Sequence, residues 1–279
     1  MGLNKALLTA LAATGYEKPT PIQAKAIPDV MAGKDLLGIA QTGTGKTAAF
    51  ALPILHRLAE NRTPPAPRTT RALILSPTRE LATQIGDSFK AYGAHLGFRV
   101  AVIFGGVKYG AQERALQQGL DILVAAPGRL LDHIQQKNLD LSSTEIFVLD
   151  EADQMLDLGF IKPIRQIVSR IPAKRQNLFF SATMPSEIGK LAGELLKDPV
   201  KVQVTPQATT VGSPSSPHWS AYRRRWTPSR MTGPPRDLAL MPASGPTSAS
   251  MPVVRSAPAT ADRRSDNRAP PSRPGGEGA

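Results

Sequence analysis

The sequence predicts an α/β domain, in which a parallel β-sheet carries helices on both faces, followed by a disordered C-terminal tail. Three observations support this fold class. Short apolar runs alternate with helical patterns, a glycine-rich loop joins one apolar run to a helix, and the composition changes near Thr205. We therefore expect a folded domain over residues 1–205 and a tail over residues 206–279.

The elements of the domain follow from hydrophobic periodicity. Leucines recur on one face of residues 3–13, and two prolines introduce a second helix near 21–32. Strands are expected near 35–40, 71–76, 99–104, 121–125, 146–150, 176–181 and 200–204. Several of these runs are apolar throughout, which is typical of a parallel sheet covered on each side. The proline-rich stretch 61–70 is expected to be a surface loop.

The glycine-rich stretch at residues 40–47 reads Ala-Gln-Thr-Gly-Thr-Gly-Lys-Thr and leads into an apolar helix. A strand, a glycine turn, Gly-Lys-Thr and a helix form the pattern of a loop that cradles a nucleoside triphosphate. Lys46 would neutralise the β- and γ-phosphates, and the hydroxyl of Thr47 would ligate Mg²⁺. The alternative is a chance Gly-Lys-Thr at the start of a helix.

Acidic residues follow the apolar run at 146–149. A buried parallel strand would deliver Asp150 and Glu151 to its carboxyl end, where ligands of open α/β sheets bind. Asp150 could hold Mg²⁺ through water, and Glu151 could take a proton from an attacking water molecule. Alone, these residues could equally be acids that favour a helix N-terminus. Together with the glycine-rich loop, they predict an ATP site.

Composition limits the class of protein. The chain has no cysteine, which excludes disulfides and thiolate chemistry and fits a cytoplasmic location. No apolar run approaches the ~20 residues of a membrane span, so we expect no membrane association. The formal net charge of +12 favours a polyanionic partner.

The tail differs in composition from the domain. Residues 206–279 contain ten arginines, no lysine and thirteen of the 26 prolines, a composition typical of disorder. Arg223–Arg225 could tether nucleic acid, or the tail could be a solvated segment without a dedicated role. The simultaneous rise of arginine, proline and alanine also fits GC-rich DNA that is translated out of frame.

A further motif, Gly15-Tyr16-Glu17-Lys18-Pro19-Thr20-Pro21-Ile22-Gln23, precedes the loop. A glutamine held on such a turn can bond both N6 and N7 of adenine. The sequence therefore resembles the first RecA-like domain of the DEAD-box RNA helicases, over roughly residues 1–205 and in particular their bacterial RhlE-type branch. The other ordered segments are 40–47, Pro77-Thr78-Arg79-Glu80-Leu81, Gly105-Gly106, Pro127-Gly128-Arg129, Asp150-Glu151-Ala152-Asp153 and Ser181-Ala182-Thr183.

The resemblance implies a RecA-like P-loop NTPase fold, ATP and Mg²⁺ as cofactors, and RNA as a partner bound without sequence preference. The residues it implies for ATP are Tyr16, Gln23, Gly43, Thr44, Gly45, Lys46 and Thr47; for catalysis, Lys46, Asp150 and Glu151; and for the metal, Thr47 and Asp150. Those implied for RNA are Pro77, Thr78, Arg79, Gly105, Gly106, Gly128 and Arg129; those for coupling hydrolysis to unwinding are Asp153, Ser181 and Thr183, through hydroxyl hydrogen bonds to Asp153. Arg79 and Arg129 could instead be surface charges or structural ion-pair partners.

The sequence departs from the family pattern in three places. Ala126 stands where the family has threonine, the aromatic residue expected upstream of Gly15 would fall before Met1, and nothing after Thr205 resembles the second RecA-like domain with its arginine fingers. We therefore expect ATP hydrolysis and duplex unwinding by this chain to be impaired. The alternatives are a non-enzymatic RNA-binding fragment and an inert product of a disrupted gene.

Overall fold

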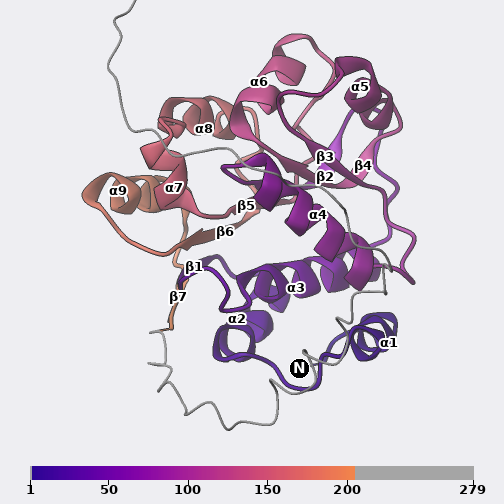
Figure 1. Cartoon of the computed structure of the whole chain (residues 1–279), viewed down its shortest axis with the longest axis vertical. Helices are drawn as coiled ribbons and strands as arrows, with labels where there is room; N and C mark the ends of the chain where they lie inside the picture. Colours follow the sequence, from indigo (N-terminus) through magenta and orange to yellow (C-terminus); the bar gives the residue numbers. More distant parts are fainter. Residues whose placement is uncertain (1, 205–279) are drawn as a thin grey trace, which may run out of the picture. The chain divides into compact units, whose positions relative to one another are not determined.

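A computed structural model describes residues 2–204 of the chain (Figure 1). The expected tail lies outside the described residues. The helices are α1 (Lys5–Ala13), α2 (Pro21–Met31), α3 (Lys46–Glu60), α4 (Arg79–Tyr92), α5 (Tyr109–Gln117), α6 (Pro127–Gln135), α7 (Ala152–Asp157), α8 (Ile161–Val168) and α9 (Ser186–Leu195). The strands are β1 (Leu36–Ile39), β2 (Thr70–Leu75), β3 (Val100–Ile103), β4 (Leu120–Ala125), β5 (Ile146–Leu149), β6 (Gln176–Ser181) and β7 (Val200–Gln203).

The seven strands form one parallel sheet in the order β3-β4-β2-β5-β6-β1-β7. All seven strands that the sequence predicts are present, within one or two residues at each end. The first helix begins at Lys5 rather than at residue 3, because the side chain of Asn4 caps it by accepting from Ala6 N. The expected α/β fold class is confirmed.

Alternating side chains of the strands enter two separate cores. On β2, Ala72 and Ile74 pack with α1–α4, whereas Leu73 and Leu75 pack with α5–α9. Figure 1 shows α2 and α3 on one side of the sheet and α6, α8 and α9 on the other. Because both faces are covered, the central strands are buried along their whole length.

Because all strands are parallel, their carboxyl ends lie at the same edge of the sheet, and the loops at this edge carry polar side chains. Residues 40–45 follow β1, residues 76–78 follow β2, and residues 150–151 follow β5. Strands β5, β6 and β1 are neighbours, so the segments that follow them lie side by side. No helix in the part of the chain that the structure describes is long and apolar enough to cross a membrane.

Candidate functional site

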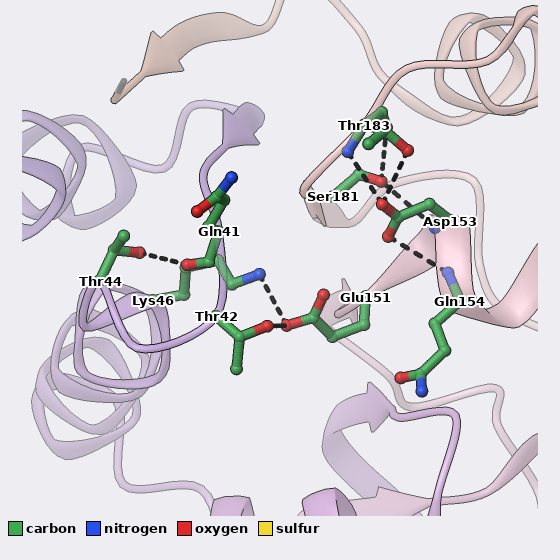
Figure 2. A network of polar contacts seen from close by, with 9 residues as sticks. All are labelled: Gln41, Thr42, Thr44, Lys46, Glu151, Asp153, Gln154, Ser181 and Thr183. Carbon is green, nitrogen blue, oxygen red and sulfur yellow. Dashed lines mark hydrogen bonds and ion pairs between the residues drawn. The ribbon is translucent and has the colours of Figure 1, made fainter. Parts of the chain in front are cut away.

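The predicted triphosphate loop and the acidic segment after β5 meet at this edge of the sheet (Figure 2). The Nζ atom of Lys46 lies 2.7 Å from Oε1 of Glu151, and Thr42 Oγ1 donates to the same oxygen at 2.8 Å. The two charged side chains are only 5% and 9% exposed. The pair is therefore a buried ion pair, whose mutual attraction offsets the cost of removing both charges from water.

Glu151 has an unusual backbone conformation. Its φ of 56° lies in the left-handed region, although glutamate has a Cβ atom, and it precedes the first residue of α7. This conformation costs about 1–2 kcal/mol in a non-glycine residue. Strained residues of this kind concentrate at functional sites, where the surrounding structure holds them in place.

Asp150 is buried beside this pair. Its side-chain atom Oδ1 has no hydrogen-bond partner within residues 2–204. Burial raises the pKa of Asp150 to about 7, against the lowering effect of the Lys46 ammonium group. A buried carboxylate oxygen without a donor is the kind of group that a cation or its hydration water satisfies. Together with the hydroxyl of Thr47 at the start of α3, it fits Mg²⁺ that is brought in by a phosphate ligand.

The loop itself depends on Gly45, which precedes α3 with a φ of 93°. A Cβ atom at this position would lie 2.6 Å from Gln23 Nε2 and 2.9 Å from Thr20 Oγ1. Gly43 also has a positive φ, of 86°. Since the first N–H groups of a helix have no acceptor within it, those of α3 are available to an anion.

Gln23 joins the loop to the start of α2. Its Nε2 donates to Gly45 O at 3.2 Å, and its Oε1 accepts from Thr20 N at 3.0 Å. Gln23 also lines a pocket of about 290 Å³ together with Tyr16, whose hydroxyl lies 2.7 Å from that of Tyr92. The two residues implied for adenine thus share one pocket beside the predicted phosphate loop.

Asp153, Ser181 and Thr183 form a second polar cluster (Figure 2). Both the backbone N and Oγ1 of Thr183 donate to Asp153 Oδ2 at 2.8 Å. The Ser181 hydroxyl also bonds to Asp153, but at its backbone: it accepts from the backbone N of Asp153 at 3.2 Å and donates to Thr183 O. Burial opposes ionisation of Asp153, but the hydrogen bonds that Thr183 donates to its carboxylate outweigh this effect and lower its pKa.

The segments implied for RNA follow three neighbouring strands, β2, β4 and β3. Pro77 is buried, and the Thr78 hydroxyl caps α4 by accepting from Leu81 N at 3.3 Å. Arg79 is exposed, and its guanidinium lies 4.8 Å from the centre of the Phe104 ring. Three glycines of these segments are exposed, and the space that a side chain would enter is open at each of them, so their backbone is accessible; they are Gly105, Gly106 and Gly128.

Arg129 is less accessible than the sequence suggests. Its side chain is 15% exposed, and Nη1 lies 3.3 Å from both Val107 O and Gln112 Oε1. The guanidinium also lies over the Tyr109 ring, at 5.4 Å from its centre. Arg129 therefore has a structural role in addition to any contact with a ligand.

Comparisons with known proteins agree with this geometry. The family profile described as DEAD/DEAH box helicase matches residues 20–191. The chain belongs to the DEAD/DEAH box helicase family. Curated relatives of this DEAD-box chain include the ATP-dependent RNA helicase DeaD of Klebsiella pneumoniae, 45% identical over 81% of this chain and 34% of the relative. The DEAD-box ATP-dependent RNA helicase CshA of Bacillus cereus is 42% identical over 76% of this chain and 39% of its own length.

Solved structures give the same assignment of fold. A DEAD box protein from Methanococcus jannaschii matches with a TM-score of 0.68 and 38% identity, over 74% of this chain and 55% of that one. A hypothetical ATP-dependent RNA helicase from Sulfolobus tokodaii matches with a TM-score of 0.66 and 36% identity, over 72% and 57%. The curated relatives are named as ATP-dependent RNA helicases, so the family is one of ATP-hydrolysing enzymes. This chain spans about a third of the length of the DeaD relatives.

Sequence reasoning did not single out two residues of this edge. Thr42 lies inside the glycine-rich stretch, and its hydroxyl donates to Glu151. The only indication of this bond in the sequence is that a hydroxyl side chain stands within the loop. Gln112 lies within an ordinary helical pattern, and nothing in its neighbours indicates that it contacts Phe104, Arg129 and His133.

Proposed function

We propose that this domain binds ATP with Mg²⁺ and RNA, and that it hydrolyses ATP as the catalytic half of a DEAD-box helicase. The observation that carries the proposal is the buried contact of 2.7 Å between Lys46 of the glycine-rich loop and Glu151. It brings a phosphate-neutralising cation and a candidate general base to one point. Asp150 adds a buried carboxylate beside them.

The ion pair gives Lys46 two alternative partners. Without nucleotide it neutralises Glu151, and in the ATP complex its ammonium group would turn to the β- and γ-phosphates. Glu151 would then be free to accept the proton of the attacking water, while Thr42 keeps one of its oxygens oriented. Thr47 and Asp150 would hold Mg²⁺, which neutralises charge that develops on the phosphates. Loss of the ion pair is thus part of forming the reactive complex.

Gln23 and Tyr16 would receive the adenine in the pocket that they line. Hydrolysis would be reported to the RNA side through Asp153 and Thr183, because this pair lies two residues from Glu151 and joins the segments after β5 and β6. The segments after β2, β3 and β4 would contact the sugar–phosphate chain. Backbone N–H groups and arginine bind phosphate oxygens without reading base sequence.

The longer relatives are named as RNA helicases, that is, as enzymes that unwind duplexes. How far this chain unwinds RNA is a further part of the proposal. We expect slow turnover, because residues 1–279 contain no segment that resembles the family's His-Arg-Ile-Gly-Arg motif. Arginine fingers contribute about 10³–10⁵ in rate to phosphoryl transfer. The RhlE-type branch and the cytoplasmic location remain predictions of the sequence. A non-enzymatic RNA-binding protein is the rival, and measured turnover distinguishes the two.

The decisive experiment compares two substitutions in purified chain. Glu151→Gln keeps the size of the side chain but removes the base, so ATP binding should persist while hydrolysis falls by about 10²–10⁴. Lys46→Ala should weaken nucleotide binding itself. Fluorescent-nucleotide titration measures the binding, and phosphate release with and without RNA measures the turnover. If Glu151→Gln hydrolyses ATP at the parent rate, the assignment of the base is wrong.

A further inference from the structure

Two segments of the candidate RNA edge are joined by one buried side chain, and the third segment contacts one of the residues that it holds. The three segments follow β2, β3 and β4, which are neighbours in the sheet. Between the latter two segments lies Gln112 of α5, which is 7% exposed. It has no access to a ligand of its own, so any effect on RNA must pass through the residues that it contacts.

The amide of Gln112 joins two elements. Its Nε2 donates to Phe104 O at 2.9 Å, directly before the Gly105–Gly106 turn. Its Oε1 accepts from Arg129 Nη1 at 3.3 Å and lies 3.2 Å from His133 Nε2. Arg129 and His133 are one turn apart on α6, so a single amide fixes the glycine turn relative to α6.

The remaining contacts extend the same arrangement. Arg129 also donates to Val107 O, on the far side of the glycine turn from Phe104. The ring of Phe104 lies below the guanidinium of Arg79, the exposed cation of the segment after β2. Side chains therefore hold the carbonyl groups on both sides of the turn, those of Phe104 and Val107. The ring of Phe104 also supports Arg79.

We propose that Gln112 is a positioning residue for RNA binding, which sets the Gly105–Gly106 turn and Arg129 at the spacing needed by consecutive phosphates of one strand. The inference rests on the proposed function, because it concerns the RNA edge of that same domain. Glutamine suits this position, since one end of its side chain supplies both a donor for Phe104 and an acceptor for Arg129. Glutamate lacks the donor, and methionine lacks both groups.

The test compares Gln112→Met with a matched control, Gln117→Met, on the full chain. Gln117 is on the same helix and is exposed. The probe is a fluorescein-labelled single-stranded oligouridylate, titrated with Mg²⁺ and a non-hydrolysable ATP analogue well below the unfolding temperature. We expect Gln112→Met to bind it about three- to tenfold more weakly, as for the loss of one or two buried hydrogen bonds. The control should bind like the parent.

Two further measurements separate positioning from general loss of structure. The affinity for a fluorescent ATP analogue should stay within about twofold of the parent, a small difference on the scale of binding free energies. Amide hydrogen exchange should accelerate in residues 105–108 and remain unchanged in residues 40–47, because only the former are held by Gln112. A uniform rise in exchange would indicate ordinary destabilisation and overturn the proposal.

The outcomes also distinguish the two levels of inference. If the parent binds oligouridylate and Gln112→Met binds it equally well, the positioning role is wrong and the proposed function stands. If the parent binds no RNA, the proposed function and the positioning role fail together. The double variant Gln112→Met with Arg129→Met should lose less affinity than the sum of the two single losses, because Gln112 acts partly through Arg129; strictly additive losses would contradict this coupling.

Discussion

The buried ion pair between Lys46 and Glu151 should contribute to folding stability in the absence of nucleotide. Lys46→Met would leave the Glu151 carboxylate, which is 9% exposed, with only the Thr42 hydroxyl as a partner. Removing one member of a buried pair costs about 3–5 kcal/mol. We expect the lower value, about 3 kcal/mol, because the Thr42 hydroxyl remains as a hydrogen-bond partner of the carboxylate. In a domain of this size that loss lowers Tm by roughly 6–12 °C.

Removal of both charges should reverse most of this loss. The double variant Lys46→Met with Glu151→Gln should lie within about 1 kcal/mol of the parent, because no uncompensated charge stays buried. The assay is urea denaturation followed by circular dichroism, without nucleotide. Lys34→Met is the control, since Lys34 pairs with Asp29 at 2.8 Å but is 56% exposed. It should lose less than about 1 kcal/mol.

If the double variant loses the sum of the two single losses, the charges do not interact in the folded protein, and the ion pair contributes nothing to the arrangement of the loop. Equal stability of Lys46→Met and the parent would refute the argument as well.

Three further predictions concern other parts of the chain. Gly45→Ala should destabilise the domain by about 1–2 kcal/mol from its backbone conformation alone, and thermal unfolding without ligand should show this loss. Burial lowers the pKa of His133. Below pH ~6.5 the unfolded chain therefore takes up a proton more readily than the folded one, and stability falls as the pH falls. Between neutral and mildly acidic pH, the urea midpoint should fall further in the parent than in His133→Gln, and an identical pH dependence in both would contradict this. Replacing Arg223–Arg225 with glutamine should reduce the slope of log K against log salt for RNA by about 2 if each arginine neutralises one phosphate; an unchanged slope would show that these arginines do not contact RNA.

Much of the fold could be predicted from the sequence, because parallel strands buried on both faces are apolar throughout. The runs at β2 and β4 contain consecutive apolar residues, and the structure places both inside the sheet. Order along the sheet could not be read from periodicity. That β1 lies between β6 and β7 is decided by long-range packing, such as the register that pairs Leu36 with both Leu178 and Val200.

The candidate site divides in the same way. Motifs identify Lys46 and Glu151 as candidates. Their direct contact depends on the order of the strands, because β1 and β5 are separated in the sheet only by β6. Arg129 shows the opposite limit. Its motif suggests an exposed phosphate ligand, whereas an aromatic ring and two acceptors from α5 and the preceding loop hold most of the side chain inside. Contacts between distant segments have no local signature.

The two bonds of the Gln23 amide restrict which purine the adjacent pocket can accept. With Nε2 turned to Gly45 O and Oε1 to Thr20 N, the amide has one N–H and one lone pair left to offer. Adenine presents a matching acceptor and donor at N7 and N6, whereas guanine presents acceptors at both N7 and O6. Guanine would set O6 against Oε1, and rotating the amide by half a turn would only set Oε1 against N7 instead, while breaking the bonds to Gly45 O and Thr20 N. The loss of two hydrogen bonds costs about 1–3 kcal/mol, or roughly five- to 150-fold in affinity. In the nucleotide complex that we propose, the backbone groups of Thr20 and Gly45 would therefore set the preference for adenine by fixing the orientation of the Gln23 amide.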